Sequence, residues 1–107
     1  LFMARVIDYI SAHLPNGDLG INEMSQSLCM SSSTFRRRMY AITKGSPKMF
    51  VRVVQINKAK ELLSSTTLTI KEISAQCGYK EVNSFIRAFQ SDTGVTPAKW
   101  RDQCKTE

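Results

Sequence analysis

The sequence of 107 residues predicts an all-α fold of seven helices. Apolar residues recur at spacings of three and four along the chain, and almost no segment alternates as a half-buried strand would. The second half of the chain also repeats the order of helices and turns found in the first. With 42% hydrophobic residues, a chain of this length can bury a core.

The first predicted helix is amphipathic, and a short second helix follows it. The inward-facing positions of the first helix are Phe2, Val6, Ile7 and Ile10. This helix should stop by residues 15–17, where proline, asparagine and glycine follow one another. The short second helix carries its apolar residues at Ile21, Met24 and Leu28.

The third helix is predicted to begin at the three serines of residues 31–33, which are typical helix-capping residues. Its inward-facing positions are Phe35, Met39 and Ile42. Lys44 and Gly45 end it, and Pro47 suits the first turn of a long fourth helix. The apolar positions of that long helix are Phe50, Val53 or Val54, Ile56, Ala59, Leu62 and Leu63.

Three shorter helices are predicted after a polar break at residues 64–67. The fifth helix has its apolar residues at Ile70, Ile73 and Cys77, and it should end at Gly78. The sixth runs from Glu81 through Thr93 with Phe85 and Phe89 inward. Pro97 opens the seventh helix, in which we expect Trp100 to be a core residue rather than an exposed stacking platform.

The internal repeat has a nearly constant offset. At an offset of 49, the equivalent pairs are Ile21 and Ile70, Glu23 and Glu72, Met24 and Ile73, Ser25 and Ser74, and Leu28 and Cys77. At an offset of 50, they are Phe35 and Phe85, Arg37 and Arg87, Met39 and Phe89, Ser46 and Thr96, Pro47 and Pro97, and Phe50 and Trp100. Each copy has the spacing of a helix-turn-helix, in which a small residue lets the second helix pack across the first.

The positive charge is concentrated in one segment. The net charge is +6, yet residues 31–60 alone hold eight basic residues and no acidic one. The first 30 residues are net negative, and residues 61–107 are neutral. A basic run without acids favours a docking surface for phosphates over a merely solvated face.

Several function classes lack support in the sequence. It contains one histidine, three cysteines, no glycine-rich phosphate loop, no nucleophile motif and no apolar run of membrane length. We therefore expect no enzyme activity, no catalytic residue, no cofactor, no metal site and no membrane contact. Cys29 and Cys77 are expected to be reduced thiols in the core of a cytoplasmic protein.

The second repeat copy carries the most specific motifs. It reads Ile70-Lys-Glu-Ile-Ser-Ala-Gln-Cys-Gly-Tyr, then Ser84-Phe-Ile-Arg-Ala-Phe, then Gly94-Val-Thr-Pro-Ala-Lys-Trp-Arg101. Over about residues 2–104, the chain resembles the DNA-binding domain of the AraC/XylS family of bacterial transcription regulators. The resemblance implies two helix-turn-helix subdomains, residues 1–46 and 66–107, joined by a long helix at residues 47–65. The first copy departs from the family pattern at two turns, where Cys29 replaces glycine and a glycine is shifted to Gly45.

The resemblance implies sequence-specific binding of double-stranded DNA. The second helix of each copy, the recognition helix, would enter the major groove, and the two would read successive segments about 10 base pairs apart. The base-contact candidates are Ser33, Arg36, Arg37, Asn83, Ser84 and Arg87. Arginine pairs with guanine and asparagine with adenine, and Ile86 is placed to touch a thymine methyl.

Phosphate contacts are expected from helix starts and basic flanks, where backbone N–H groups and positive charge attract anions. The phosphate-contact candidates are Asn22, Arg38, Lys48, Lys71 and Lys99. The alternative function is a basic all-helical interaction module that binds an acidic protein, which explains the charge but not the repeat. An RNA-binding helical domain is a second alternative, but the sequence lacks the exposed aromatic residues on which such domains stack bases.

The chain starts at Leu1, which suggests a fragment of a longer protein. The family resemblance implies an N-terminal sensor, effector-binding or signalling region outside this chain. RNA polymerase is a further candidate partner that the resemblance implies.

Overall fold

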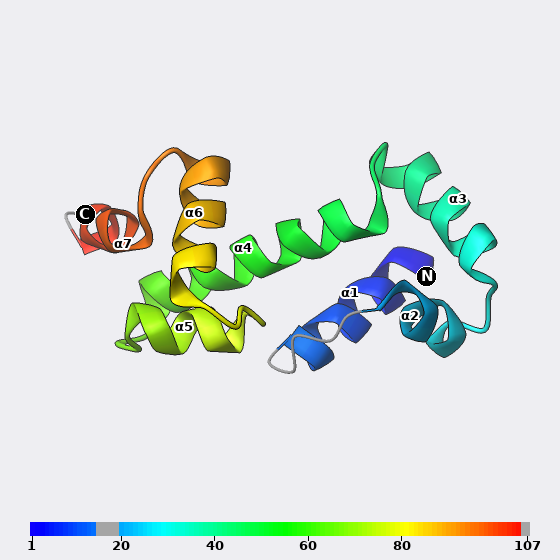
Figure 1. The fold of residues 1–107 in the computed structure, drawn as a ribbon, viewed down its shortest axis with the longest axis horizontal. Coiled ribbons are helices and arrows are strands. Elements are labelled where there is room, and N and C mark those ends of the chain that lie inside the picture. The colour runs from blue at the N-terminus through cyan, green and yellow to red at the C-terminus, as the bar shows by residue number, and fades with distance from the viewer. Residues whose placement is uncertain (15–19, 106–107) are drawn as a thin grey trace. The chain divides into compact units, whose positions relative to one another are not determined.

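The computed structural model describes residues 1–14 and 20–105, and these residues form seven helices without a strand (Figure 1). The helices are α1 (Phe2–His13), α2 (Ile21–Ser27), α3 (Ser32–Thr43), α4 (Pro47–Ser65), α5 (Ile70–Gln76), α6 (Val82–Thr93) and α7 (Pro97–Lys105). The predicted all-α fold is confirmed, while the predicted stop at residues 15–17 lies outside the described residues. Two compact units are present, unit 1 (Leu1–Val54) and unit 2 (Gln55–Glu107).

Unit 1 is built around one hydrophobic core. Its buried residues are Val6, Ile10, Leu14, Met24, Leu28, Phe35 and Met39, with Phe50, Val51 and Val54 of α4 packed against them. Of the two alternatives on α4, Val54 therefore faces the core, and Val53 is 50% exposed.

Two inward predictions in unit 1 are wrong. Ile7 is 42% exposed, because neighbouring helical residues point about 100° apart and Val6 takes the core position. Ile42 is 53% exposed, since it lies in the last turn of α3, beyond Met39, the last buried residue of that helix. The apolar spacing thus identified the correct face of each helix but overestimated the width and length of the buried stripe.

Unit 2 has an equivalent core. Its buried residues are Ile56, Ala59, Leu62, Leu63, Ile73, Cys77, Phe85 and Phe89. Trp100 packs against this cluster, with its ring edge-on to Phe89 at 5.8 Å between centroids. The expectation that Trp100 belongs to the core is confirmed, and the Nζ of Lys60 lies 5.2 Å from the centre of the Trp100 ring.

A buried serine marks the helix crossing in each unit. Ser25 and Ser74 are almost fully buried. The Ser25 hydroxyl donates to the backbone oxygen of Asn22 at 3.0 Å, and that of Ser74 to the backbone oxygen of Lys71 at 2.8 Å. Because each hydroxyl is satisfied within its own helix, a polar residue can be buried there at little cost.

Among the residues that the structure describes, four in turns adopt a left-handed backbone. Gly78 and Gly94 have φ of 88° and 85°, while the equivalent Cys29 and Lys44 have φ of 59° and 61°. The left-handed position predicted for Gly78 is confirmed. In unit 1 the same conformation is imposed on residues with a Cβ, whereas Gly45 keeps a negative φ.

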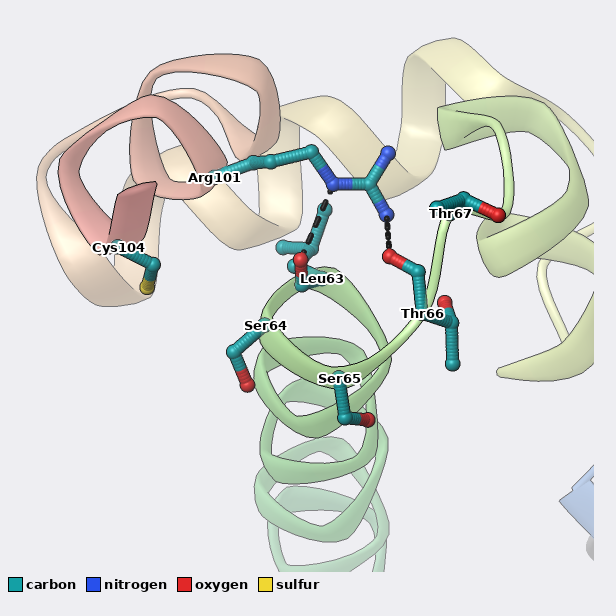
Figure 2. A pocket seen from close by; sticks show the side chains of 7 residues that line it. All are labelled: Leu63, Ser64, Ser65, Thr66, Thr67, Arg101 and Cys104. Atoms are coloured by element: carbon teal, nitrogen blue, oxygen red, sulfur yellow. Dashed lines mark hydrogen bonds between the residues drawn. The ribbon is translucent and has the colours of Figure 1, made fainter. Parts of the chain in front are cut away.

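The C-terminal end of α4 is anchored by Arg101 of α7. Its Nε donates to the Leu63 oxygen at 3.0 Å, and its two Nη atoms donate to the oxygens of Leu68 at 2.6 Å and Thr66 at 3.3 Å. Arg101 lines a pocket of about 550 Å³ together with Cys104, and Figure 2 shows the side chains of this lining. Arg101 therefore donates hydrogen bonds to backbone carbonyl oxygens at the end of α4 and just beyond it. The arginine of the C-terminal motif thus has a structural role.

Candidate nucleic-acid interface

The two recognition helices, α3 and α6, have almost the same exposure pattern. Phe35 and Phe85 are fully buried, and so are Met39 and Phe89 one turn later. The opposite face of each helix is open to solvent. Its exposed base-contact candidates are Ser33, Arg36 and Arg37 on α3, and Asn83 and Arg87 on α6, while Ser84 is half-buried.

The start of α3 is held by side-chain hydrogen bonds. The Thr34 N–H donates to the Ser31 hydroxyl oxygen at 3.2 Å, and this hydroxyl donates to the Thr34 Oγ1 at 3.0 Å. Nη2 of Arg37 lies 3.5 Å from the same Thr34 oxygen. The cap thereby fixes the first turn of α3, and Arg37 lies one turn further along the exposed face.

Helices α3 and α6 differ at the residue that directly follows the buried phenylalanine of each helix. Ile86 is half-buried and packs against the core of unit 2, so it is less available to a thymine methyl than the sequence suggested. Its equivalent on α3 is the exposed Arg36. The first recognition helix therefore presents a second arginine where α6 presents an apolar side chain.

The five phosphate-contact candidates are all exposed. Asn22 and Lys71 occupy equivalent positions near the starts of α2 and α5, and Lys48 and Lys99 lie in the first turns of α4 and α7. The Arg38 guanidinium lies 5.7 Å from the centre of the Phe2 ring in α1, which separates it from the face formed by the other α3 candidates.

A polar bridge between α2 and α3 was missed by the sequence analysis. The Ser32 hydroxyl donates to the Asn22 Oδ1 at 2.7 Å. The two residues are ten positions apart and belong to different helices, so neither periodicity nor capping patterns could pair them. The bridge ties the half-buried Ser32, the first residue of α3, to α2.

The cysteines differ in environment. Cys77 is buried, and burial raises the pKa of its thiol to about 11, with a smaller opposing effect from the Lys58 charge. Cys29, by contrast, is an exposed free thiol, so its predicted place in the core is wrong. Cys29 lies in the turn after α2, where its backbone is left-handed with φ of 59°.

Within residues 1–14 and 20–105, no three histidine, cysteine or acidic side chains are grouped so that they could hold a metal ion. None of the helices described is both long enough and apolar enough to cross a membrane.

Comparison with known proteins adds family evidence. A family model for a helix-turn-helix domain matches residues 24–103. The HTH-type transcriptional activator RhaR of Salmonella arizonae is 38% identical over 71 residues, which are 66% of this chain and 25% of that protein. The chain thus spans about a quarter of the length of the curated relatives it matches.

Solved structures share the fold. The C-terminal domain of AraT, a response regulator from Geobacillus stearothermophilus, has a TM-score of 0.83 and 30% identity, covering 94% of this chain and 83% of that chain. The DNA-binding domain of AdpA, solved with a target DNA, has a TM-score of 0.85 and covers 96% of this chain and 92% of that chain. At 22% identity the AdpA likeness supports the shared fold.

The family model and the RhaR relatives agree with the repeated helix-turn-helix and its exposed recognition helices. The chain therefore belongs to the AraC/XylS family of bacterial transcription regulators and is one of its sequence-specific, DNA-binding helix-turn-helix domains.

Proposed function

We propose that α3 and α6 each enter a major groove and read successive segments of one DNA duplex. The observation that carries this proposal is the shared exposure pattern, in which equivalent phenylalanines are buried and equivalent arginines are exposed two residues later. The proposed base-contact residues are Ser33, Arg36, Arg37, Asn83, Ser84 and Arg87.

The chemistry of these side chains fits base recognition. Arg37 and Arg87 can each donate two parallel hydrogen bonds to the O6 and N7 atoms of a guanine. Asn83 can pair in the same bidentate way with adenine. Because the two arginines are equivalent in the repeat, each recognition helix would select one guanine.

Backbone contacts would set the position of each unit on the duplex. The proposed phosphate-contact residues are Asn22, Arg38, Lys48, Lys71 and Lys99. The exposure of all five supports this role. In this proposal, the subdomains at residues 1–46 and 66–107 each hold one groove segment, and the helix at residues 47–65 connects them.

The whole protein would be a transcription regulator. RhaR is named as a transcriptional activator and AraT as a response regulator, and the chain spans a quarter of RhaR. We propose that this domain is joined to an N-terminal sensor, effector-binding or signalling region and acts in the bacterial cytoplasm. RNA polymerase is the proposed protein partner of the assembled regulator.

Selection of binding sites from random duplexes, followed by titration of variants, tests the proposed function. Arg37→Ala and Arg87→Ala should each cost about 1–3 kcal/mol on the selected site and relax the preference at one base pair. Arg5→Ala removes an exposed arginine from α1 and is the matched control. If Arg37→Ala or Arg87→Ala weakened binding to selected and random DNA equally, the substituted arginine would not contact a base. Failure of the unmutated chain to bind duplex DNA would overturn the proposed function.

A further inference from the structure

The bridge between α2 and α3 involves three hydroxyl or amide groups. Ser32 donates to the Asn22 Oδ1 at 2.7 Å, and Ser25 donates to the Asn22 backbone oxygen at 3.0 Å. The Ser25 and Ser32 oxygens are 3.5 Å apart. Each hydroxyl has a single hydrogen, so the two short bonds to Asn22 account for both of them. Asn22 is therefore bound through its backbone by α2 and through its side chain by α3.

Unit 2 lacks this bridge at the equivalent positions. Lys71 replaces Asn22, and Val82 replaces Ser32, so one side has no acceptor and the other has no donor. There the connection between the two helices includes a ring contact, with Tyr79 and Phe85 centroids 5.4 Å apart. The fold itself can thus be built without the polar bridge, which indicates a role specific to unit 1.

The bridge acts at the start of the recognition helix. Ser32 is the first residue of α3, directly before Ser33 and one turn before Arg36. The turn that leads into α3 contains Cys29 in the left-handed conformation, which is less favourable for cysteine than for the glycine found in unit 2. A hydrogen bond across the two helices would limit rotation of the first turn of α3 about its axis.

We propose that Ser32 is a positioning residue that fixes the orientation of α3 through Asn22 and thereby sets the base selectivity of unit 1. The proposal rests on the proposed function, because it requires that α3 reads bases. Ser32 itself need not touch DNA. Loss of the bridge displaces Ser33 and Arg36 relative to base edges, whereas contacts to phosphates tolerate small displacements.

The experiment measures dissociation constants on a selected site and on random duplex DNA at one salt concentration. Ser32→Ala should lower the ratio of random to selected dissociation constants about three- to tenfold, the effect of one hydrogen bond. Ser32→Thr keeps a hydroxyl donor and should restore the ratio. Ser27→Ala removes an exposed serine hydroxyl from α2 and is the matched control. Melting temperatures show whether any variant is unfolded.

A double-mutant cycle separates positioning from other effects. In an Asn22→Ala background, Ser32→Ala should cause no further loss of selectivity, because its partner is already absent. Full additivity in this cycle, an unchanged ratio in Ser32→Ala, or failure of Ser32→Thr to rescue would each overturn the proposal. If the unmutated chain did not distinguish selected from random DNA, the proposed function itself would fail.

Discussion

Units 1 and 2 form the same left-handed turns from different residues. Where unit 2 uses Gly78 and Gly94, unit 1 uses Cys29 and Lys44, with φ angles that differ by less than about 30°. The packing of consecutive helices therefore dictates the backbone at these turns, and the residue type adjusts only its cost. Unit 1 tolerates about 1–2 kcal/mol of conformational strain at each such turn, and unit 2 does not incur it.

The units also differ in their recognition helices. In α3, residues 36–38 are three consecutive arginines, while the equivalent residues 86–88 of α6 are isoleucine, arginine and alanine. The acid-free basic segment, residues 31–60, contains all of α3 and the first two thirds of α4, and the rest of unit 2 is neutral. We infer that unit 1 and α4 together supply most of the non-specific electrostatic affinity, and that the part of unit 2 after α4 contributes mainly through specific contacts.

The largest expected effect compares the two aromatic anchors. Phe35 and Phe85 are both fully buried, so Phe35→Ala and Phe85→Ala should each lower the free energy of unfolding by about 3–5 kcal/mol. Phe85 lies near the rings of Tyr79 and Phe89, whereas Phe35 lies near that of Phe2. The Phe85 variant should therefore be the less stable by about 1 kcal/mol in denaturant unfolding. If the Phe85→Ala protein were more stable than the Phe35→Ala protein, the predicted difference between the two anchors would be wrong.

The electrostatic difference is tested by salt dependence. Replacing Lys44, Lys48 and Lys58 by glutamine should flatten the slope of log K against log salt by up to about 0.9 for each phosphate contact removed. The matched control replaces Arg5 and Lys80 by glutamine, two exposed basic residues outside the basic segment that are not phosphate-contact candidates, and should flatten the slope less for each charge removed. Equal flattening for each charge removed in the two variants would show that the non-specific affinity does not depend on the basic segment.

Exchanging residues at the left-handed turns should have a smaller effect on stability. Gly94→Lys should destabilise the protein by about 1 kcal/mol, and Lys44→Gly should stabilise it by a similar amount. A Cβ built on Gly94 has no neighbouring atom within 4 Å, so the cost there is conformational and not steric. Thermal unfolding of both variants measures the exchange, and a stabilising Gly94→Lys would show that the turn geometry is not what separates the units.

The fold could be predicted because its signals are local. Apolar spacing, capping serines and the prolines at helix starts identified every helix described, and the repeat placed Phe35 and Phe85 at equivalent anchors. The exposure of Ile7 and Ile42 could not be predicted, because a pattern gives the direction of a face but not where the neighbouring helix ends. Cys29 was misplaced for a related reason, since its side-chain direction depends on a left-handed turn.

Sequence spacing likewise predicted part of the candidate interface and missed the rest. The exposure of Arg36 and Arg37 follows from their positions relative to Phe35, so sequence spacing was sufficient. The Ser32–Asn22 bridge joins two helices, and the three bonds of Arg101 join α7 to the end of α4 and the segment after it, 33 to 38 residues away. Contacts of this kind depend on how helices cross, which local patterns do not encode.

The smallest expected effect concerns the helix starts and appears only in acid. Thr69 and Glu72 form a reciprocal capping box at α5, with bonds of 3.0 and 3.1 Å, whereas the equivalent Gly20 at α2 has no side chain to cap with. The bonds to the backbone N–H and side chain of Thr69 lower the pKa of the Glu72 carboxyl. Because the folded-state pKa lies below that of the unfolded chain, this stabilisation is complete above the unfolded pKa and is lost as pH falls through the folded one.

Glu72→Gln keeps an acceptor for the Thr69 N–H but removes the titration, so its melting temperature should fall less than that of the parent between pH 6 and about pH 3. An identical fall in both proteins would show that the charge of Glu72 adds nothing to the cap, and that the two helix starts differ only in their neutral hydrogen bonds.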